Sequence, residues 1–253
     1  MIKVVIIGSG NVAHHLISAF ANSDAVAVIQ NFVRTKEHAT HLLDSNKITT
    51  NIKALADADV YIISVSDNAV SEVSSQLNFQ NKLVVHTSGN VAMNDLDDKN
   101  RSGVFYPLQT FSKSKEVNFR EIPICLEAQN GDDYQLLETI TKSISDKIFN
   151  INSTQRKALH VSAVFVNNFT NYLYQIGNEI CKKNNIPFEI LQPLIQETAN
   201  KILMLSPNDA QTGPAKRNDT QTINSHLNFL SDENQKEIYK LLTKSIIDNG
   251  KKL

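Results

Sequence analysis

The residues with the clearest chemical potential form a glycine-containing run, GSGNVA, at positions 8–13. A short apolar run ends at this point, and the residues from Asn11 onward have the apolar spacing of a helix. At such a junction Gly8 permits a tight turn, Gly10 lets the main chain approach a pyrophosphate, and Ala13 keeps the helix close to the strand. The spacing predicts a dinucleotide-binding turn whose helix amides face the phosphates; the alternative is a structural turn that binds nothing. The expected cofactor-binding residues are Gly8, Ser9, Gly10, Asn11 and Val12.

The residues after the second predicted strand indicate which dinucleotide binds. Sites that prefer NAD often have Asp or Glu at this strand end, where the carboxylate holds the ribose hydroxyls. This chain has Arg34, Thr35 and Lys36 there. A guanidinium can pair with a 2′-phosphate in forked geometry, so Arg34 and Thr35 are expected to contact NADP. Glu37 leaves NAD open, and the alternative is that these are solvated loop charges.

Polar residues also follow later predicted strands, at the ends where ligands collect in open α/β sheets. In a sheet of order 3-2-1-4-5-6, the motifs VSDN and HTSGN lie next to the glycine turn, and VFYPLQTF follows the next strand. The predicted roles are cofactor binding for Ser66, Asp67 and Thr87, catalysis for His86, and substrate binding for Tyr106 and Gln109. Two simpler interpretations stay open: Ser66 and Asp67 cap a helix, and His86 is a hydrogen-bonded core histidine.

A long predicted helix has a polar face without charged residues. At about 100° per residue, His160, Asn167, Asn171 and Asn178 point within about 20° of one direction. A solvated face usually carries Lys and Glu, whereas this face has His and side-chain amides. We expect it to line a cleft beside the cofactor, with His160 as proton donor and Asn167 or Asn171 orienting a carbonyl or imine. The alternative is that the face is solvated.

A late loop, QTGPAKRND at residues 211–219, places two cations before another predicted helix. Asn218 or Asp219 can cap this helix, and Lys216 and Arg217 lie near its N-terminus. The loop predicts an anion site in which Arg217 binds a substrate carboxylate; the alternative is a basic surface loop.

These residues need a scaffold that brings distant strand ends together. Up to about residue 150, short apolar runs alternate with helical patterns, which is typical of a parallel sheet with crossover helices. Strands are predicted at 2–7, 25–33, 48–51, 60–65, 83–86, 104–105, 122–126 and 147–151, and helices at 11–22, 35–44, 68–77 and 131–145. Later residues have helical patterns, with Pro193 expected to kink the second helix. The predicted class is α/β: a Rossmann-like doubly wound, mostly parallel sheet over residues 1–152, followed by an all-α domain over residues 153–253.

Composition narrows the range of partners. The 253 residues include 25 Lys and Arg against 26 Asp and Glu, which removes any general attraction to nucleic acid or an anionic membrane. The chain has no apolar run of about 18 residues. Because the first predicted strand begins at residue 2, we expect no leader. Its two cysteines, Cys125 and Cys181, lack the spacing of a metal site. We expect a cytoplasmic protein with no nucleic-acid, membrane or metal partner.

Six motifs, taken in order, resemble a family of bacterial proteins that pair a Rossmann-like domain with a helical C-terminal domain of unknown function. They are IGSGNVAHHL, SVSDNAV, HTSGN, GVFYPLQTFSK, LHVSAVFVNNFTNYLY and AQTGPAKRND, and they span nearly the whole chain. The architecture is similar to that of pyrroline-5-carboxylate reductase, β-hydroxyacid dehydrogenases and deazaflavin-dependent NADP oxidoreductases. The resemblance implies NADP binding by the glycine turn, a dimerising helical domain and an oxidoreductase activity of unassigned substrate. The long helix departs from β-hydroxyacid dehydrogenases, which use a Lys and an Asn one turn apart, because it begins with His160.

The expected function is that of an NADP-dependent oxidoreductase, which transfers hydride between nicotinamide and a small anionic carbonyl, imine or alcohol. The helices after residue 152 are expected to form a homodimer. One alternative is a non-catalytic NADP-binding module that senses redox state, because no Lys or Tyr compels a dehydrogenase mechanism. A further alternative is a deazaflavin-linked NADP oxidoreductase.

Overall fold

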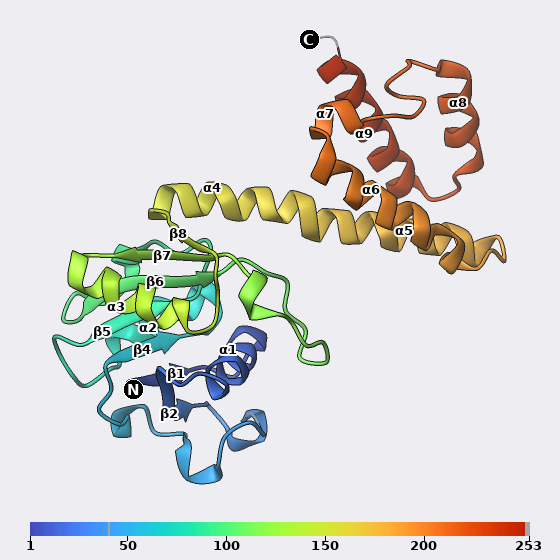
Figure 1. Cartoon of the computed structure of the whole chain (residues 1–253). Coiled ribbons are helices and arrows are strands. Elements are labelled where there is room, and N and C mark those ends of the chain that lie inside the picture. The colour runs from blue at the N-terminus through green and yellow to red at the C-terminus, as the bar shows by residue number, and fades with distance from the viewer. Residues whose placement is uncertain (40, 251–253) are drawn as a thin grey trace. The chain divides into compact units, whose positions relative to one another are not determined.

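A computed structural model of the chain describes residues 1–39 and 41–250, apart from the side chain of residue 38. Its first part contains one eight-stranded sheet of order β3-β2-β1-β4-β5-β6-β7-β8 (Figure 1). All neighbouring strands run parallel except β6 and β7, which pair antiparallel. The strands are β1 (Ile2–Ile7), β2 (Val26–Phe32), β3 (Ile48–Thr49), β4 (Val60–Ile63), β5 (Leu83–His86), β6 (Arg101–Pro107), β7 (Ile124–Ala128) and β8 (Ile148–Asn150). The predicted Rossmann-like, mostly parallel sheet is confirmed.

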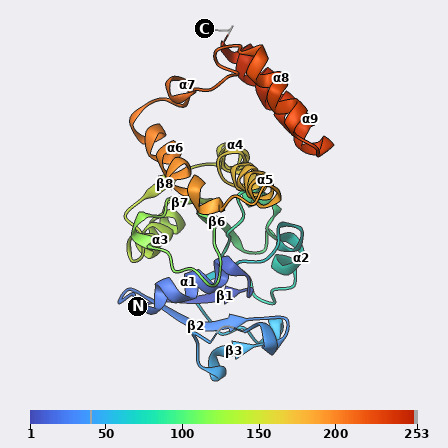
Figure 2. The same ribbon diagram turned by 90° about the vertical axis from the view of Figure 1, so that its right-hand side faces the viewer.

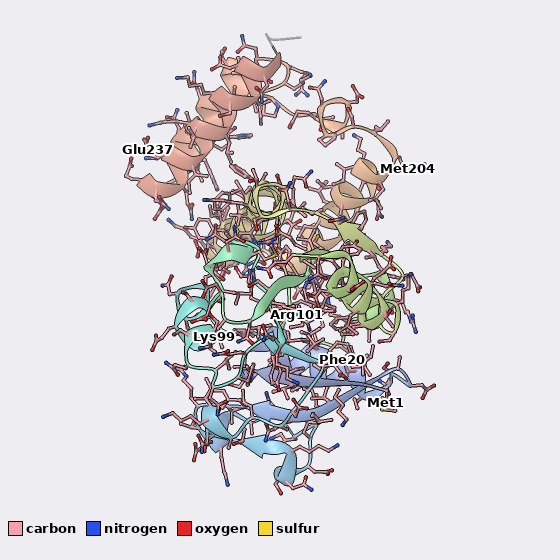
Figure 3. The ribbon with its side chains drawn as sticks, turned by 90° about the vertical axis from the view of Figure 1, so that its left-hand side faces the viewer. Met1, Phe20, Lys99, Arg101, Met204 and Glu237 are labelled. Atoms are coloured by element: carbon pink, nitrogen blue, oxygen red, sulfur yellow. The ribbon has the colours of Figure 1, made fainter. Side chains whose placement is uncertain are left out.

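The central strands consist mostly of apolar residues because both faces of the sheet are covered. Residues 4–7 of β1 are fully buried. On one face, α1 (Asn11–Ala21) and α3 (Gly131–Lys142) contribute Phe20 and Leu137 to the core. On the other face, α2 (Val70–Ser75) contributes Val70 to a second cluster. Figure 3 labels Phe20, the large α1 side chain buried between helix and sheet.

The predicted helix over residues 35–44 is wrong. A single 3-10 turn spans Lys36–His38, and the described residues after it form turns. Residue 40 lies outside the described residues. The segment has few apolar residues, and Leu42 is 42% exposed, so little burial offsets the unfavourable first turn of a short helix.

The remainder of the chain is helical, with α4 (Ser153–Ala163), α5 (Thr170–Lys183), α6 (Gln192–Met204), α7 (Pro207–Ala210), α8 (Thr220–Phe229) and α9 (Glu233–Gly250). Asn152 caps α4 as predicted, since its side chain accepts from the Gln155 amide at 2.9 Å. A π-helical segment, Val164–Phe169, follows α4 and leads into α5. Pro193 does not kink a helix, because it lies in the first turn of α6, where a missing amide proton costs nothing.

The chain divides into two compact units, residues 1–167 and 168–253. The strands end before α4, near the predicted domain boundary at residue 152, but α4 itself belongs to the first unit. Within the second unit, α8 and α9 lie side by side (Figures 1 and 2), where the His226 Nδ1 and Tyr239 Oη atoms are 2.8 Å apart. No helix in the described ranges is both long and apolar enough to cross a membrane.

Candidate active site

A cleft of about 680 Å³ opens in the first unit, where β1, β4, β5 and β6 end. This volume suits a bound ligand of cofactor size. The sheet order explains the convergence, because the strand order reverses beside β1 and leaves a crevice at the carboxyl ends. The predicted site residues that line the cleft are Gly8, Ser9, Gly10, Asn11, Val12, Arg34, Ser66, Asp67, Thr87, Tyr106, Gln109 and His160.

The glycine turn has the geometry that a pyrophosphate requires. Gly8 has φ of +134°, and a Cβ atom there would lie 2.0 Å from the carbonyl oxygen of Ser64. No other residue fits this position. Gly10 precedes the first turn of α1 and has no atom within 4 Å of the place where a Cβ would lie. The main chain is thus bare and open where phosphate oxygens would meet helix amides, and these residues fit a dinucleotide.

Charge around this turn also suits an anion. The first turn of α1 contains no acidic residue, so only the positive end of the helix dipole faces the cleft. The Asn11 side chain donates to the Phe111 carbonyl at 2.7 Å, which fixes the loop after β6 beside α1. Phosphate groups would therefore meet backbone amides without a nearby carboxylate on this helix.

The end of β2 carries a cation at the cleft and no carboxylate. Arg34 is exposed and lines the cleft, whereas Thr35 is exposed and does not line it. Among the described residues, Asp67 is the one acidic residue that lines the cleft, and it follows β4 instead. A 2′-phosphate near Arg34 would face a guanidinium, which can bind it through two donors.

Ser66 and Thr87 lie at the ends of β4 and β5. Ser66 precedes a 3-10 turn, Asp67–Ala69, but its side chain makes no capping hydrogen bond, so the simple capping interpretation of Ser66 is not seen. The Thr87 hydroxyl donates to the Ser64 hydroxyl at 3.3 Å and thereby ties the two strand ends together.

The far end of the cleft holds a pair formed by Tyr106 and His160. The Tyr106 Oη atom lies 3.2 Å from His160 Nδ1, and the rings meet edge to face with centroids 6.2 Å apart. Burial raises the pKa of Tyr106 to about 12, so the phenol stays protonated and its hydroxyl can donate to Nδ1. When it does, the proton of neutral His160 resides on Nε2, the ring nitrogen that Tyr106 does not contact.

Gly89, for which the sequence predicted no role, makes this pair possible. A Cβ atom on Gly89 would lie 2.6 Å from His160 Nδ1 and 2.8 Å from Tyr106 Oη. The two rings therefore pack directly on the main chain after β5. The signal in the sequence was a glycine three residues after a predicted strand end, within HTSGN.

His86 lies in the core and does not line the cleft. It is fully buried, and its Nδ1 atom accepts from the Ser88 amide at 3.1 Å. Burial, and then the nearby Arg156 charge, lower the pKa of His86 to about 3. The structure thus places it as the hydrogen-bonded core histidine that was the simpler interpretation.

The π-helical segment Val164–Phe169 interrupts the long helix between His160 and Asn171. A π turn contains more residues than an α turn, so the direction of later side chains shifts by roughly one residue's rotation. His160 precedes the segment and lines the cleft, whereas Asn167 is exposed and does not. Asn171 lies after the segment, in the second unit, and is exposed.

The loop at residues 211–219 also belongs to the second unit. Asp219 caps α8 as predicted, accepting from the Thr222 amide at 3.0 Å. Hydrogen bonds from Thr222, and then the Arg217 charge, lower the pKa of Asp219. Arg217 is exposed, and its predicted role in substrate binding stays a prediction.

The two cysteines do not line the cleft. Cys125 and Cys181 are both buried and free of a disulfide. Burial raises the pKa of the Cys125 thiol to about 11, which keeps the sulfur protonated and a poor nucleophile. Within the described ranges, no group of three or more His, Cys, Asp or Glu residues is placed to hold a metal ion.

Comparison with known proteins relates both parts of the chain to described families. Residues 3–90 match the family "NADP oxidoreductase coenzyme F420-dependent", and residues 122–246 match "Domain of unknown function (DUF2520)". No curated protein matches the chain.

Solved structures are similar over almost the full length. A Bacteroides fragilis protein described as a "putative NADP oxidoreductase" has 39% sequence identity and a TM-score of 0.88, over 98% of each chain. A pyrroline carboxylate reductase from Plasmodium falciparum, with NADP bound, has 13% identity and a TM-score of 0.62, over 99% of this chain and 97% of that one. An imine reductase from Myxococcus stipitatus, in complex with NAD+, has 15% identity and a TM-score of 0.60, over 99% and 94%.

The last two structures share the fold alone, whereas the first is a relative in sequence over the whole chain. The glycine turn and the family match at residues 3–90 agree on the same segment. The chain belongs to the NADP oxidoreductase family in which an N-terminal domain of the coenzyme F420-dependent type precedes a DUF2520 domain.

Proposed function

We propose that this protein is an NADP-dependent oxidoreductase that transfers hydride between nicotinamide and a small anionic carbonyl, imine or alcohol. The observation that carries the proposal is that one cleft contains both the glycine turn and the Tyr106–His160 pair. A cofactor anchored at the turn would extend toward that pair. The pyrroline carboxylate and imine reductases of the same fold support an imine or a related carbonyl as substrate.

Different residues of the first unit would bind different parts of the cofactor. The bare main chain at Gly8 and Gly10 and the first amides of α1 would bind the pyrophosphate. Arg34 would bind the 2′-phosphate, which selects NADP over NAD. Thr87, Ser66 and Asp67 would contact the ribose and nicotinamide side. When bound, the reduced cofactor supplies the hydride.

His160 would supply the proton that accompanies hydride transfer. Tyr106 would donate to Nδ1, 3.2 Å away, and so keep the exchangeable proton on Nε2, where a substrate oxygen or nitrogen can accept it. Reaction in the opposite direction returns the proton to Nε2. Gln109 lines the same cleft and would orient the reacting group. Asn167, Asn171 and Arg217 are further proposed substrate contacts.

The second candidate function is hydride exchange between NADP and a deazaflavin. The match of residues 3–90 to a coenzyme F420-dependent family favours it. In this case the cleft would hold two cofactors in succession or together, and His160 would contact the deazaflavin instead of a small anion.

One experiment separates these functions. The purified protein is mixed with NADPH and, in parallel, with small 2-oxo acids, cyclic imine acids or an oxidised deazaflavin, while loss of reduced nicotinamide is followed by absorbance. The proposal predicts turnover with a small anion that falls about 100-fold in His160→Gln. Oxidation of NADPH by the deazaflavin, but by none of the small anions, would favour the second candidate. Tight NADPH binding without turnover in any mixture would contradict both and leave a redox-sensing module.

The proposed assembly is a homodimer formed through the helices of the second unit. Leu203 and Met204, at the end of α6, are 80% and 86% exposed, and Figure 3 labels Met204 there. Leu241 on α9 is 65% exposed. Large apolar side chains at this exposure, gathered in one small unit, favour burial against another subunit.

A further inference from the structure

A buried arginine anchors the beginning of α4, the helix that carries His160. The Arg156 side chain is 1% exposed and forms an ion pair with Glu127 of β7, whose side chain is 15% exposed. Burial of an ion pair costs free energy of desolvation, and well-packed apolar residues can often replace such a pair without loss of stability. Its presence beside the proposed site therefore points to a role other than stability.

Arg156 and Glu127 connect three separate elements. The Arg156 Nη1 atom donates to Glu127, and Nη2 donates to the Val91 carbonyl at 2.6 Å. Glu127 also accepts from the Ser153 amide at 3.0 Å and from the Ser153 hydroxyl at 2.8 Å. The pair thus ties the first turn of α4 to β7 and to the segment after β5.

Two of these elements, α4 and the segment after β5, contact or carry the Tyr106–His160 pair. His160 is four residues after Arg156, so the two side chains lie on the same side of α4, one turn apart. Val91 is two residues after Gly89, on which the rings of Tyr106 and His160 pack. Rotation of α4, or withdrawal of the segment after β5, would separate His160 from Tyr106.

We infer that Arg156 and Glu127 are positioning residues that hold His160 Nδ1 against Tyr106 and so fix which ring nitrogen faces the substrate. The inference rests on the proposed function of His160. A guanidinium is required because Nη1 and Nη2 reach acceptors on two different elements in one rigid plane. A lysine ammonium is a single point charge and cannot reproduce this fork.

The test measures the histidine itself and needs no substrate. Protein with 15N-labelled histidine is studied by NMR at a pH at which His160 is neutral, with the His160 signals assigned through His160→Gln. The variants are Arg156→Lys and Glu127→Gln. The matched control is Arg101→Lys, which alters an ion pair of 3.2 Å to buried Asp133 at the opposite end of β6 from Tyr106. NADPH affinity is measured in parallel by calorimetry.

In the wild type and in Arg101→Lys, the 15N signals of His160 are expected to show one unprotonated and one protonated ring nitrogen. Arg156→Lys and Glu127→Gln are expected to average the two signals, while NADPH affinity stays within about twofold. An unaltered His160 in both variants, or equal averaging in Arg101→Lys, would overturn the inference. If Arg156→Lys does not fold, Glu127→Gln decides alone. If the wild type does not bind NADPH, the proposed function is refuted instead, since the histidine signals are measured without cofactor.

Discussion

The hydroxyl group of Tyr106 lies 3.2 Å from Nδ1 of His160, although the two residues are 54 positions apart in the chain. A strand supplies the tyrosine and a helix supplies the histidine. Gly89 allows the rings to approach, because any side chain there would collide with both. This contact gives a half-buried histidine a fixed orientation at the end of the cleft.

Removing the Tyr106 hydroxyl should damage catalysis more than folding. Tyr106→Phe leaves Nδ1 without its donor, so the proton is no longer confined to Nε2. We expect hydride transfer to fall about 10-fold to 100-fold and the free energy of unfolding to fall by about 1 kcal/mol. Single-turnover oxidation of NADPH and urea unfolding measure the two effects. Tyr134→Phe on α3 is the matched control, and equal rates for the two variants would refute the role of Tyr106.

The two glycines of the turn should respond differently to alanine. Gly8→Ala forces a Cβ atom to 2.0 Å from a carbonyl oxygen at positive φ, so we expect a loss of about 3 kcal/mol of unfolding free energy or more. Gly10 has φ of −72° and ψ of −177°, which alanine adopts, and its Cβ would meet nothing. Gly10→Ala should therefore fold normally but bind NADPH about tenfold less tightly. Chemical denaturation and calorimetry measure both, and equal losses of stability would contradict the geometry.

The buried His86 should make the protein less stable in mild acid. Its pKa is about 3 in the folded protein against 6.5 as the ordinary value, so the unfolded chain binds more protons between these limits. Stability from this group is complete above pH 6.5 and declines as pH falls, by about 1.4 kcal/mol per pH unit. Urea unfolding between pH 6 and pH 4 should show this slope in the wild type relative to His86→Gln. Parallel curves for the two proteins would show that His86 is not held neutral.

The exposed apolar residues of the second unit should be buried in a dimer. Light scattering during size exclusion is expected to give twice the mass of one chain at micromolar concentration. Leu203→Glu combined with Met204→Glu should shift the protein toward one chain, because these side chains are among the most exposed apolar residues. A matched control is Leu42→Glu in the first unit, at 42% exposure. A single-chain mass for the wild type would contradict the proposed assembly.

Much of the fold follows from local patterns in the sequence. Buried parallel strands are continuous apolar runs, so residues 2–7 and 83–86 were predictable without knowledge of their partners. The glycine turn was equally visible, because the positive φ at Gly8 and the helix start at Asn11 are local requirements. The polar residues at strand ends then converge as a consequence of sheet order.

The parts that were missed depend on contacts between distant residues. The sequence left open whether His86 is catalytic or a buried core histidine, and nothing near His160 indicated that its partner would be Tyr106. The regular helical spacing of the long helix also gave no sign of the π-helical segment Val164–Phe169. Arg156 was not singled out at all, because its acceptors on β7 and after β5 are far away in sequence.

The most direct test of the central claim is calorimetric titration of the wild type with NADPH and NADH, repeated with Arg34→Ala and with Lys36→Ala as matched control. Arg34 lines the cleft, whereas Lys36 does not. We expect saturable binding of NADPH that is tighter than binding of NADH, and a loss of affinity of about 10-fold to 100-fold for NADPH alone in Arg34→Ala. If neither dinucleotide produces heat at millimolar concentration, the protein is not a dinucleotide-binding protein.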